Sequence, residues 1–196
     1  MHIFPQEYQV LLSDRIQRNQ HKPLVLWLTG LSGSGKSTIA NAVQNELFEQ
    51  GKLVVVLDGD NIRGGLNSDL DFSDASRSEN IRRVAEVASL FANTGFIVIV
   101  SFISPFELDR QQANRIIGNE LFREIYIEAD LSICESRDVK GLYQLARDGK
   151  LQNFTGIDSP YQIPKQPHFI VNTHSQTPEQ SANQLRNYIL HHVTLN

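Results

Sequence analysis

Mainly apolar runs recur along the chain at residues 24–28, 52–57, 96–102, 121–127 and 168–171. Runs of this kind, rich in β-branched side chains, are typical of strands covered on both faces, as in a parallel sheet. Between them, apolar residues recur every three or four positions, which predicts helices. The alternation predicts an α/β fold of three layers, with a parallel sheet of about five strands flanked by helices, because parallel neighbours need helical crossovers.

The same pattern predicts where the helices begin and end. They are expected at residues 6–20, 37–50, 74–94, 106–117 and 131–137, with a last helix starting at Thr177. Gly51 should follow the second of these, since glycine readily adopts the left-handed conformation after a helix. Ser76 and Glu79 have the spacing of a capping box at the third helix. Ser104, which precedes a proline, is a candidate N-cap for the fourth.

The composition narrows the class of protein. The chain has 196 residues, enough for one domain but too few for two ordinary ones, so residues 1–196 should form a single domain. It is 40% hydrophobic with a formal net charge of -4 and no basic block, which argues against nucleic acid as a partner. No apolar run approaches the roughly 20 residues of a membrane helix, so no membrane partner is expected. Cys134 is the only cysteine, which excludes an internal disulfide and favours a reducing cytoplasm.

The strongest chemical signal follows the first predicted strand, where residues 28–38 have the sequence LTGLSGSGKST. This is the Walker A, or P-loop, pattern of nucleotide-binding proteins. Its glycines leave room for backbone N–H groups to point at a triphosphate, and Lys36 is placed to reach the β and γ phosphates. Ser37 is the expected Mg²⁺ ligand. ATP is expected to contact Gly30, Leu31, Ser32, Gly33, Ser34, Gly35, Lys36, Ser37 and Thr38.

Polar residues also follow the next two predicted strands. Asp58 and Asp60 come directly after the strand at residues 52–57, and Ser101 lies at the end of the third strand. Because ligands of open α/β sheets bind at the carboxyl ends of the strands, these residues should face the same crevice as the P-loop. Asp60 is the better functional candidate, since Asp58 serves equally well as the cap of a short helix.

The pattern favours a small-molecule kinase over a switch GTPase. The third strand, FIVIVSF, carries no acid for Mg²⁺, and the chain has no Asn-Lys-x-Asp element for reading guanine. Small-molecule kinases with a P-loop instead close a basic lid over the phosphates. Residues 137–150 are basic and lack a clear period, so they are the expected mobile lid.

Motifs spread over the whole domain resemble those of the adenylyl-sulfate kinases. The resemblance runs from His21 to Thr173 and rests on LTGLSGSGKST, LDGDNIR, GLN with FSDASRSENIRRVAEVA, VSFISPF, CESRDVKGLY and NFTGID. It implies ATP-dependent phosphorylation of the ribose 3′-hydroxyl of adenosine 5′-phosphosulfate, in sulfate assimilation. It also implies Mg²⁺, a homodimer, an N-terminal arm at residues 1–22, and a lid and acceptor loop at residues 137–158.

The resemblance also implies which residues hold the acceptor nucleotide. These are Asp60, Arg63, Phe72, Arg77, Asn80, Ile103, Ser104, Lys140 and Phe154. Arginines and an amide suit the phosphosulfate anion. Two loop phenylalanines can sandwich the adenine, although aromatic residues on loops more often anchor the loop in the core.

Four residues are the expected catalytic set: Lys36, Asp60, Ser104 and Lys140. Asp60 would orient the 3′-hydroxyl, and Lys140 would neutralise charge on the transferring phosphoryl group. Ser104 stands where similar bacterial enzymes carry a phosphoserine, but direct in-line transfer is the favoured hypothesis. Arg137 and the loop after Val171 are candidates for holding the ATP adenine.

The chain departs from the usual family pattern at Gly64, Asp71 and Val139, none of which removes a chemical group. Two alternatives remain open. One is a P-loop kinase for a nucleoside or sugar acid, although such a site would not need two stacking aromatics and an anion clamp. The other is a nucleotide-binding regulator without activity, which the complete set of Lys36, Ser37, Asp60 and Lys140 argues against.

Overall fold

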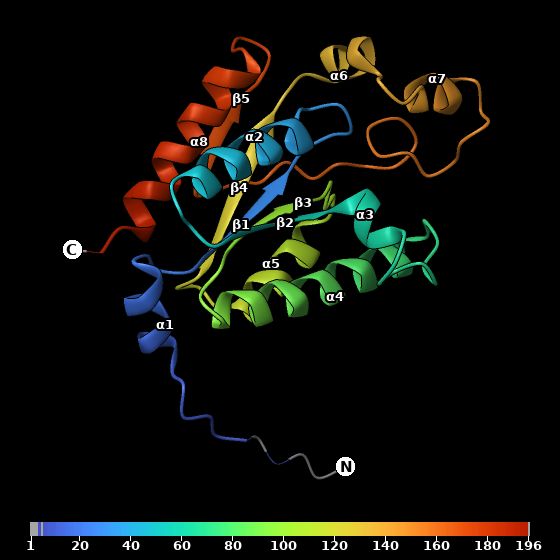
Figure 1. Ribbon diagram of the computed structural model, residues 1–196. Helices are drawn as coiled ribbons and strands as arrows, with labels where there is room; N and C mark the ends of the chain where they lie inside the picture. The colour runs from blue at the N-terminus through green and yellow to red at the C-terminus, as the bar shows by residue number, and fades with distance from the viewer. Residues whose placement is uncertain (1–3, 5, 196) are drawn as a thin grey trace.

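The computed structural model describes residue 4 and residues 6–195, and it contains a five-stranded sheet (Figure 1). Its strands are β1 (Leu24–Thr29), β2 (Val54–Asp58), β3 (Ile97–Ser101), β4 (Phe122–Glu128) and β5 (Phe169–Asn172). The order is β2-β3-β1-β4-β5 and every neighbouring pair is parallel. Each predicted strand lies within two residues of its observed position, and the predicted α/β fold is confirmed.

Helices cover both faces of this sheet and produce the three predicted layers. On one face lie α2 (Lys36–Glu49) and α8 (Pro178–Val193), and on the other lie α4 (Asp74–Asn93) and α5 (Glu107–Ile117) (Figure 1). Side chains of β1 alternate between the two cores, with Leu26 in the first and Trp27 in the second. Both are fully buried, and burying a side chain of this size contributes about 1.5–3 kcal/mol.

Shorter helices connect these layers. They are α1 (Leu12–Asn19), α3 (Gly59–Arg63), α6 (Leu131–Arg137) and α7 (Leu142–Arg147). The sequence did not predict α7, which lies in the expected lid. A small cluster that includes Cys134, Tyr143 and Phe154 packs α6 and α7 against the loop that follows. Leu31 of the P-loop joins this cluster, so the lid rests directly on the expected phosphate site.

The predicted first helix, residues 6–20, is too long. Only α1 is helical, and no residue in it is buried. Residues 6–11 make no core contact that would offset the entropy of ordering them as a helix. Positions 1–3 and 5 of the expected arm lie outside the described residues. Within the described part of the chain, no helix is long and apolar enough to cross a membrane.

Predictions for the helix termini fared differently. Gly51 follows α2 in the left-handed conformation, φ 73°, as predicted. The capping box of Ser76 with Glu79 is wrong, because Ser73 caps α4 by accepting from the Ser76 N–H. Glu79 instead accepts hydrogen bonds from the neighbouring arginines Arg82 and Arg83.

Ser104 is not the N-cap of α5. That helix begins two residues later than the prediction requires, after Phe106. Ser104 has a left-handed backbone, φ 45°, which is uncommon for a residue other than glycine. Its side-chain oxygen accepts a hydrogen bond from Trp27 Nε1 at 3.0 Å, so it faces the core below the sheet edge rather than the first turn of α5.

Candidate active site

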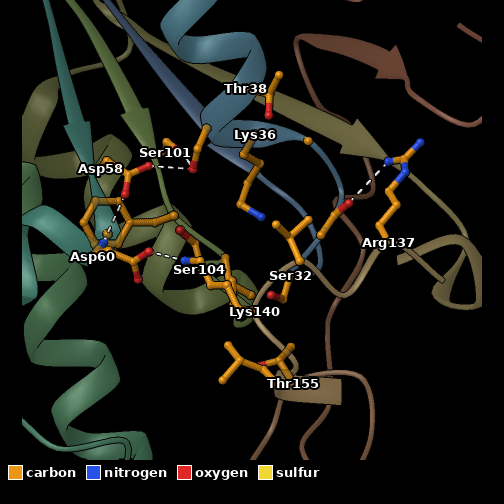
Figure 2. A pocket seen from close by; sticks show the side chains of 18 of the residues that line it. Ser32, Lys36, Thr38, Asp58, Asp60, Ser101, Ser104, Arg137, Lys140 and Thr155 are labelled. Carbon is orange, nitrogen blue, oxygen red and sulfur yellow. Dashed lines mark hydrogen bonds and ion pairs between the residues drawn. The ribbon is translucent and has the colours of Figure 1, made fainter. Parts of the chain in front are cut away.

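A cavity of about 790 Å³ lies at the carboxyl ends of the central strands (Figure 2). The P-loop and the end of β2 form one side of it, while α4, the loop after β3 and the lid form the other. The predicted residues that line it are Ser32, Gly33, Gly35, Lys36, Ser37, Thr38, Asp60, Arg63, Phe72, Arg77, Asn80, Ile103, Ser104, Lys140 and Phe154. Residues from distant parts of the sequence therefore meet in one site, as expected from a parallel sheet.

Two P-loop glycines are required by close packing. A Cβ atom on Gly30 would lie 2.5 Å from the Ile127 carbonyl oxygen, and one on Gly33 would lie 2.9 Å from the carbonyl oxygen of Cys134. Gly33 also has a positive φ of 74°. Glycine thus lets the loop lie against β4 and α6, where the backbone of any larger residue would have to shift.

Lys36 opens α2, and its side chain folds back over the P-loop. Its Nζ donates to the carbonyl oxygens of Gly30 at 2.9 Å and of Leu31 at 2.7 Å. Burial lowers the pKa of Lys36 to about 8. The ammonium group is therefore buried at the centre of the loop, at the N-terminal end of a helix, where an anion is favoured.

Ser37 and Asp58 lie together beside this lysine. The Ser37 hydroxyl donates to Asp58 Oδ2 at 2.6 Å, and the hydroxyl of Ser101 lies 3.3 Å from that of Ser37. Asp58 also caps α3, since its Oδ1 accepts from the Asp60 N–H at 3.1 Å. The two interpretations of Asp58 are therefore compatible. Ser101 lines the cavity, as its position at a strand end predicted, although the sequence assigned it no role.

Asp60 and Lys140 come from opposite sides of the cavity and form an ion pair (Figure 2). Asp60 lies in the first turn of α3, and Lys140 lies in the lid between α6 and α7. Both side chains are well exposed, at 71% and 59%. The pair spans the opening between the phosphate side and the α4 side of the site.

Both predicted arginines of the acceptor side donate hydrogen bonds to loop residues. Arg63 lies over the ring of Phe72, with 4.4 Å from its guanidinium carbon to the ring centroid, and donates to the Asp71 carbonyl oxygen at 3.1 Å. Arg77 donates to the Phe72 carbonyl oxygen at 2.9 Å and to Thr155 Oγ1 at 2.7 Å. Burial lowers the pKa of both guanidinium groups. Thr155 was not predicted and links Arg77 to the loop after α7.

Phe72 and Phe154 both line the cavity, but they differ in exposure. Phe72 is 58% exposed, whereas Phe154 is 8% exposed. The Phe154 ring packs edge-on against Tyr143, with 4.9 Å between the ring centroids. Phe154 thus also anchors its loop in the small lid cluster, as the alternative interpretation expected. Whether the two rings sandwich an adenine stays a prediction.

Arg137 lies beside the P-loop, on the side away from Asp60, as Figure 2 shows. It donates to the Gly33 carbonyl oxygen at 3.3 Å and to the Thr173 carbonyl oxygen at 2.7 Å. Arg137 and the loop after Val171 therefore lie next to each other and next to the P-loop. Their expected contact with the ATP adenine stays a prediction.

Sequence departures from the family pattern sit at the edge of the site. Gly64 is the C-cap of α3, and Val139 is 90% exposed in the lid. The Asp71 carboxylate accepts hydrogen bonds from the backbone and hydroxyl of Ser73, and these bonds lower its pKa to about 2. Asp71 therefore stabilises the turn that leads into α4.

The comparisons with known proteins agree with this arrangement. A model of the adenylylsulphate kinase family matches residues 22–172. The chain belongs to the adenylylsulphate kinase family. It is 56% identical over 187 residues to a probable adenylyl-sulfate kinase of Bacillus subtilis (strain 168), covering 95% of this chain and 91% of that one. It is 57% identical over 164 residues to an adenylyl-sulfate kinase of Geotalea daltonii, covering 84% and 81%.

A solved adenylyl-sulfate kinase has the same fold. The Mycobacterium tuberculosis APS kinase CysC, in complex with AMPPNP and APS, superposes with a TM-score of 0.82 at 44% identity, covering 85% of this chain and 96% of that one. Membership of the adenylylsulphate kinase family confirms the expected enzyme class, a phosphotransferase with an alcohol acceptor. The expected family and fold are likewise confirmed, and the role of each residue is taken up below.

Proposed function

We propose that this cavity transfers the γ-phosphoryl group of ATP to the ribose 3′-hydroxyl of adenosine 5′-phosphosulfate, giving 3′-phosphoadenosine 5′-phosphosulfate and ADP. The observation that carries the proposal is the pairing of two halves in one cavity. One half is the P-loop with buried Lys36, and the other is the set of cationic, amide and aromatic side chains around Arg63 and Arg77. Asp60 and Lys140 lie between them.

On the ATP side, the P-loop backbone and Lys36 bind the triphosphate. The Lys36 ammonium now contacts loop carbonyl oxygens, and a phosphate would replace these neutral partners with charged ones. The N-terminus of α2 adds unpaired N–H groups and the positive end of the helix dipole. Together they hold the γ-phosphorus in position for attack, which is the larger part of catalysis of phosphoryl transfer.

The donor set beside Lys36 fits Mg²⁺. Ser37 and Asp58 present oxygen atoms that already contact each other, and hard oxygen ligands are those that Mg²⁺ prefers. Among the described residues no group of three or more acidic, histidine or cysteine side chains could hold a metal by itself. This agrees with a magnesium ion bound by one or two protein oxygens together with substrate phosphates and water. When bound, the ion would neutralise phosphate charge.

On the acceptor side, Arg63, Arg77 and Asn80 would bind the phosphosulfate, with Ile103 lining the nucleotide pocket and Phe72 and Phe154 contacting the adenine. Asp60 would orient the 3′-hydroxyl and accept its proton. The 3′-oxygen then bonds to the γ-phosphorus while the bond to the β–γ bridging oxygen breaks, and ADP leaves with that electron pair. Lys140 would move from Asp60 to the transferring phosphoryl group.

Direct in-line transfer fits better than a phosphoserine intermediate. Ser104 is 2% exposed, and its hydroxyl is held by Trp27 Nε1. A phosphate on this oxygen would have to displace a core hydrogen bond. Ser104 therefore serves as a structural contact of the acceptor loop.

The assembly and location of the protein are also part of the proposal. A homodimer is favoured because Tyr8, Val10 and Leu11 of the arm are exposed and apolar surface of this kind suits a second copy. Light scattering would test it. The single cysteine, free and buried, fits the cytoplasm.

A coupled assay of ADP release tests the function. With Mg²⁺ and ATP, ADP should appear only when adenosine 5′-phosphosulfate is added, and Lys36→Ala should abolish it. Release with gluconate or a nucleoside, but not with the sulfated nucleotide, would favour a different small-molecule kinase. Binding of ATP without turnover on any acceptor would favour a regulator.

A further inference from the structure

Asn67 is a fully buried polar residue that lies outside the catalytic cavity. It follows α3, and its backbone N–H donates to the Ile62 carbonyl oxygen at 3.0 Å. Its side chain is 0% exposed and reaches across to α4, where Nδ2 donates to Asn80 Oδ1 at 2.8 Å. Asn80 does line the cavity. Asn67 therefore contacts the site through another residue.

The position carries a stability cost that packing does not explain. Asn67 Oδ1 is fully enclosed and has no hydrogen-bond partner among the described residues. A buried carbonyl without a partner is unfavourable, and an apolar side chain of similar size would avoid that cost. Among the residues that the structure describes, the one side-chain hydrogen bond of Asn67 is to Asn80. The hydrogen bond to Asn80 is the contact through which an asparagine at this position can act on the site.

That hydrogen bond fixes which way the Asn80 amide points. An asparagine side chain has one accepting oxygen and one donating NH₂ group, and either can face a ligand if the amide turns over. Asn67 donates to the oxygen, so the oxygen of Asn80 is directed away from the ligand. Asn80 lines the cavity, and among the described residues no hydrogen bond uses its Nδ2, so this NH₂ group is available as a donor. The reverse orientation would present a carbonyl oxygen to an anion.

We propose that Asn67 is a positioning residue that orients the Asn80 amide as a hydrogen-bond donor to the anionic group of the acceptor. This rests on the proposed function, in which Asn80 lies on the acceptor side. Asn67 touches no substrate. It raises affinity for the anionic acceptor because it removes the turned-over state of Asn80, in which the ligand would meet a lone pair instead of an N–H.

The test is steady-state kinetics on Asn67→Ala and Asn67→Asp. Asn67→Ala should raise the KM for adenosine 5′-phosphosulfate about twofold, because Asn80 keeps its N–H but only one of its two amide orientations then suits the ligand, and it should leave the KM for ATP unchanged. Asn67→Asp should raise it further, because a carboxylate only accepts and so draws the Asn80 N–H away from the ligand. Lowering the pH should bring the KM of Asn67→Asp back toward that of the wild type, since a protonated carboxyl group can donate to Asn80 Oδ1.

Two further variants separate positioning from general stability. Asn114→Ala is the matched control, because Asn114 also has a buried oxygen without a partner but does not line the cavity. A thermal melt compares the loss of stability in the two variants, and the acceptor KM of Asn114→Ala should equal that of the wild type. The double variant Asn67→Ala with Asn80→Ala should be no worse than Asn80→Ala alone, as expected when one residue acts through the other.

Each outcome decides the proposal. An acceptor KM in folded Asn67→Ala equal to that of the wild type, additive effects in the double variant, or an Asn67→Asp enzyme insensitive to pH would overturn it. If Asn67→Ala does not fold, the isosteric Asn67→Asp and its pH profile decide alone. A wild-type enzyme inactive on adenosine 5′-phosphosulfate would refute the proposed function instead, whereas an active enzyme with a normal KM in Asn80→Ala would refute this inference and the acceptor role of Asn80 but not the activity.

Discussion

The Lys140 ammonium contacts the Asp60 carboxylate although 80 residues separate them in the sequence. The contact joins the lid to the first turn of α3 across the mouth of the cavity. Exposed pairs of this kind contribute little to stability, about 0–1 kcal/mol. In the proposed mechanism these two residues would handle the proton and the phosphoryl charge, and the structure brings them into contact.

Asp60→Asn should lower kcat about 100-fold, because an amide can orient the 3′-hydroxyl but cannot take its proton. The KM for adenosine 5′-phosphosulfate should change much less, since Asn keeps the shape and most hydrogen bonding of Asp. Initial rates at varied acceptor measure both constants. Normal turnover in Asp60→Asn would remove this residue from the mechanism. Asp69→Asn is a suitable control, because Asp69 pairs with Arg83 and does not line the cavity.

ATP affinity should weaken as the pH rises through about 8. Burial lowers the pKa of Lys36 to about 8, so the free enzyme loses the ammonium proton in this range. A bound triphosphate favours the charged lysine, which means that binding takes up a proton once the free lysine is neutral. Calorimetry in buffers of different ionisation enthalpy would detect the uptake. In Lys36→Met the affinity should be weak and its dependence on pH in this range lost.

Arg77→Ala should raise the KM for the acceptor by about tenfold and the KM for ATP by less. Arg77 holds the loop of Phe72 and the loop of Thr155 together on the acceptor side, so both loops lose a fixed partner. Arg77→Lys should not restore the wild-type KM. The planar guanidinium donates to both loops at once, whereas the compact ammonium group of lysine cannot. A larger effect on ATP than on the acceptor would refute the placement of Arg77 on the acceptor side.

Ser104→Ala should keep at least about a tenth of wild-type turnover and lower the Tm. The loss of stability follows because the buried Trp27 N–H loses its acceptor, which costs about 1–3 kcal/mol. Mass spectrometry of wild-type protein incubated with ATP should find no phosphate on Ser104. Complete loss of turnover in a folded Ser104→Ala enzyme, together with a phosphorylated wild type, would instead support a covalent intermediate.

The sheet and the P-loop could be predicted because their signals are local. Apolar runs at residues 24–28 and 96–102 indicate buried strands, and the spacing from Gly30 to Ser37 indicates a phosphate-binding loop. Neither signal depends on contacts with distant parts of the chain. The cap of α5 was mispredicted for the opposite reason. Trp27 lies 77 residues from Ser104 and competes for its hydroxyl, and no local pattern records such a contact.

The supporting residues of the site were missed for the same physical reason. Asn67 and Thr155 act on other side chains across the tertiary structure. Their residue types are ordinary for loops and strand ends, so the sequence contains no periodicity that would distinguish them. The short helix α7 was missed because it packs in a satellite cluster with few apolar positions rather than in a main core.

His21 should make the stability of the protein fall in mild acid. The ring is fully buried just before β1, where Nε2 accepts from the Leu53 N–H at 3.1 Å and Nδ1 lies 3.1 Å from the Lys22 carbonyl oxygen. Since Nε2 accepts, the single proton of the neutral ring is on Nδ1. Burial lowers the pKa of His21 in the folded chain.

As the pH falls below about 6.5, the ordinary pKa of histidine, the unfolded chain binds a proton that folded His21 does not, so the free energy of unfolding decreases. The decrease from this residue is at most about 1.4 kcal/mol per pH unit. Urea titrations at several pH values should give a smaller decrease in His21→Gln than in the wild type, although the variant is less stable at neutral pH. His191→Gln, at an exposed position of α8, should keep the wild-type slope. Equal slopes in wild type and His21→Gln would show that His21 is not a source of the acid sensitivity.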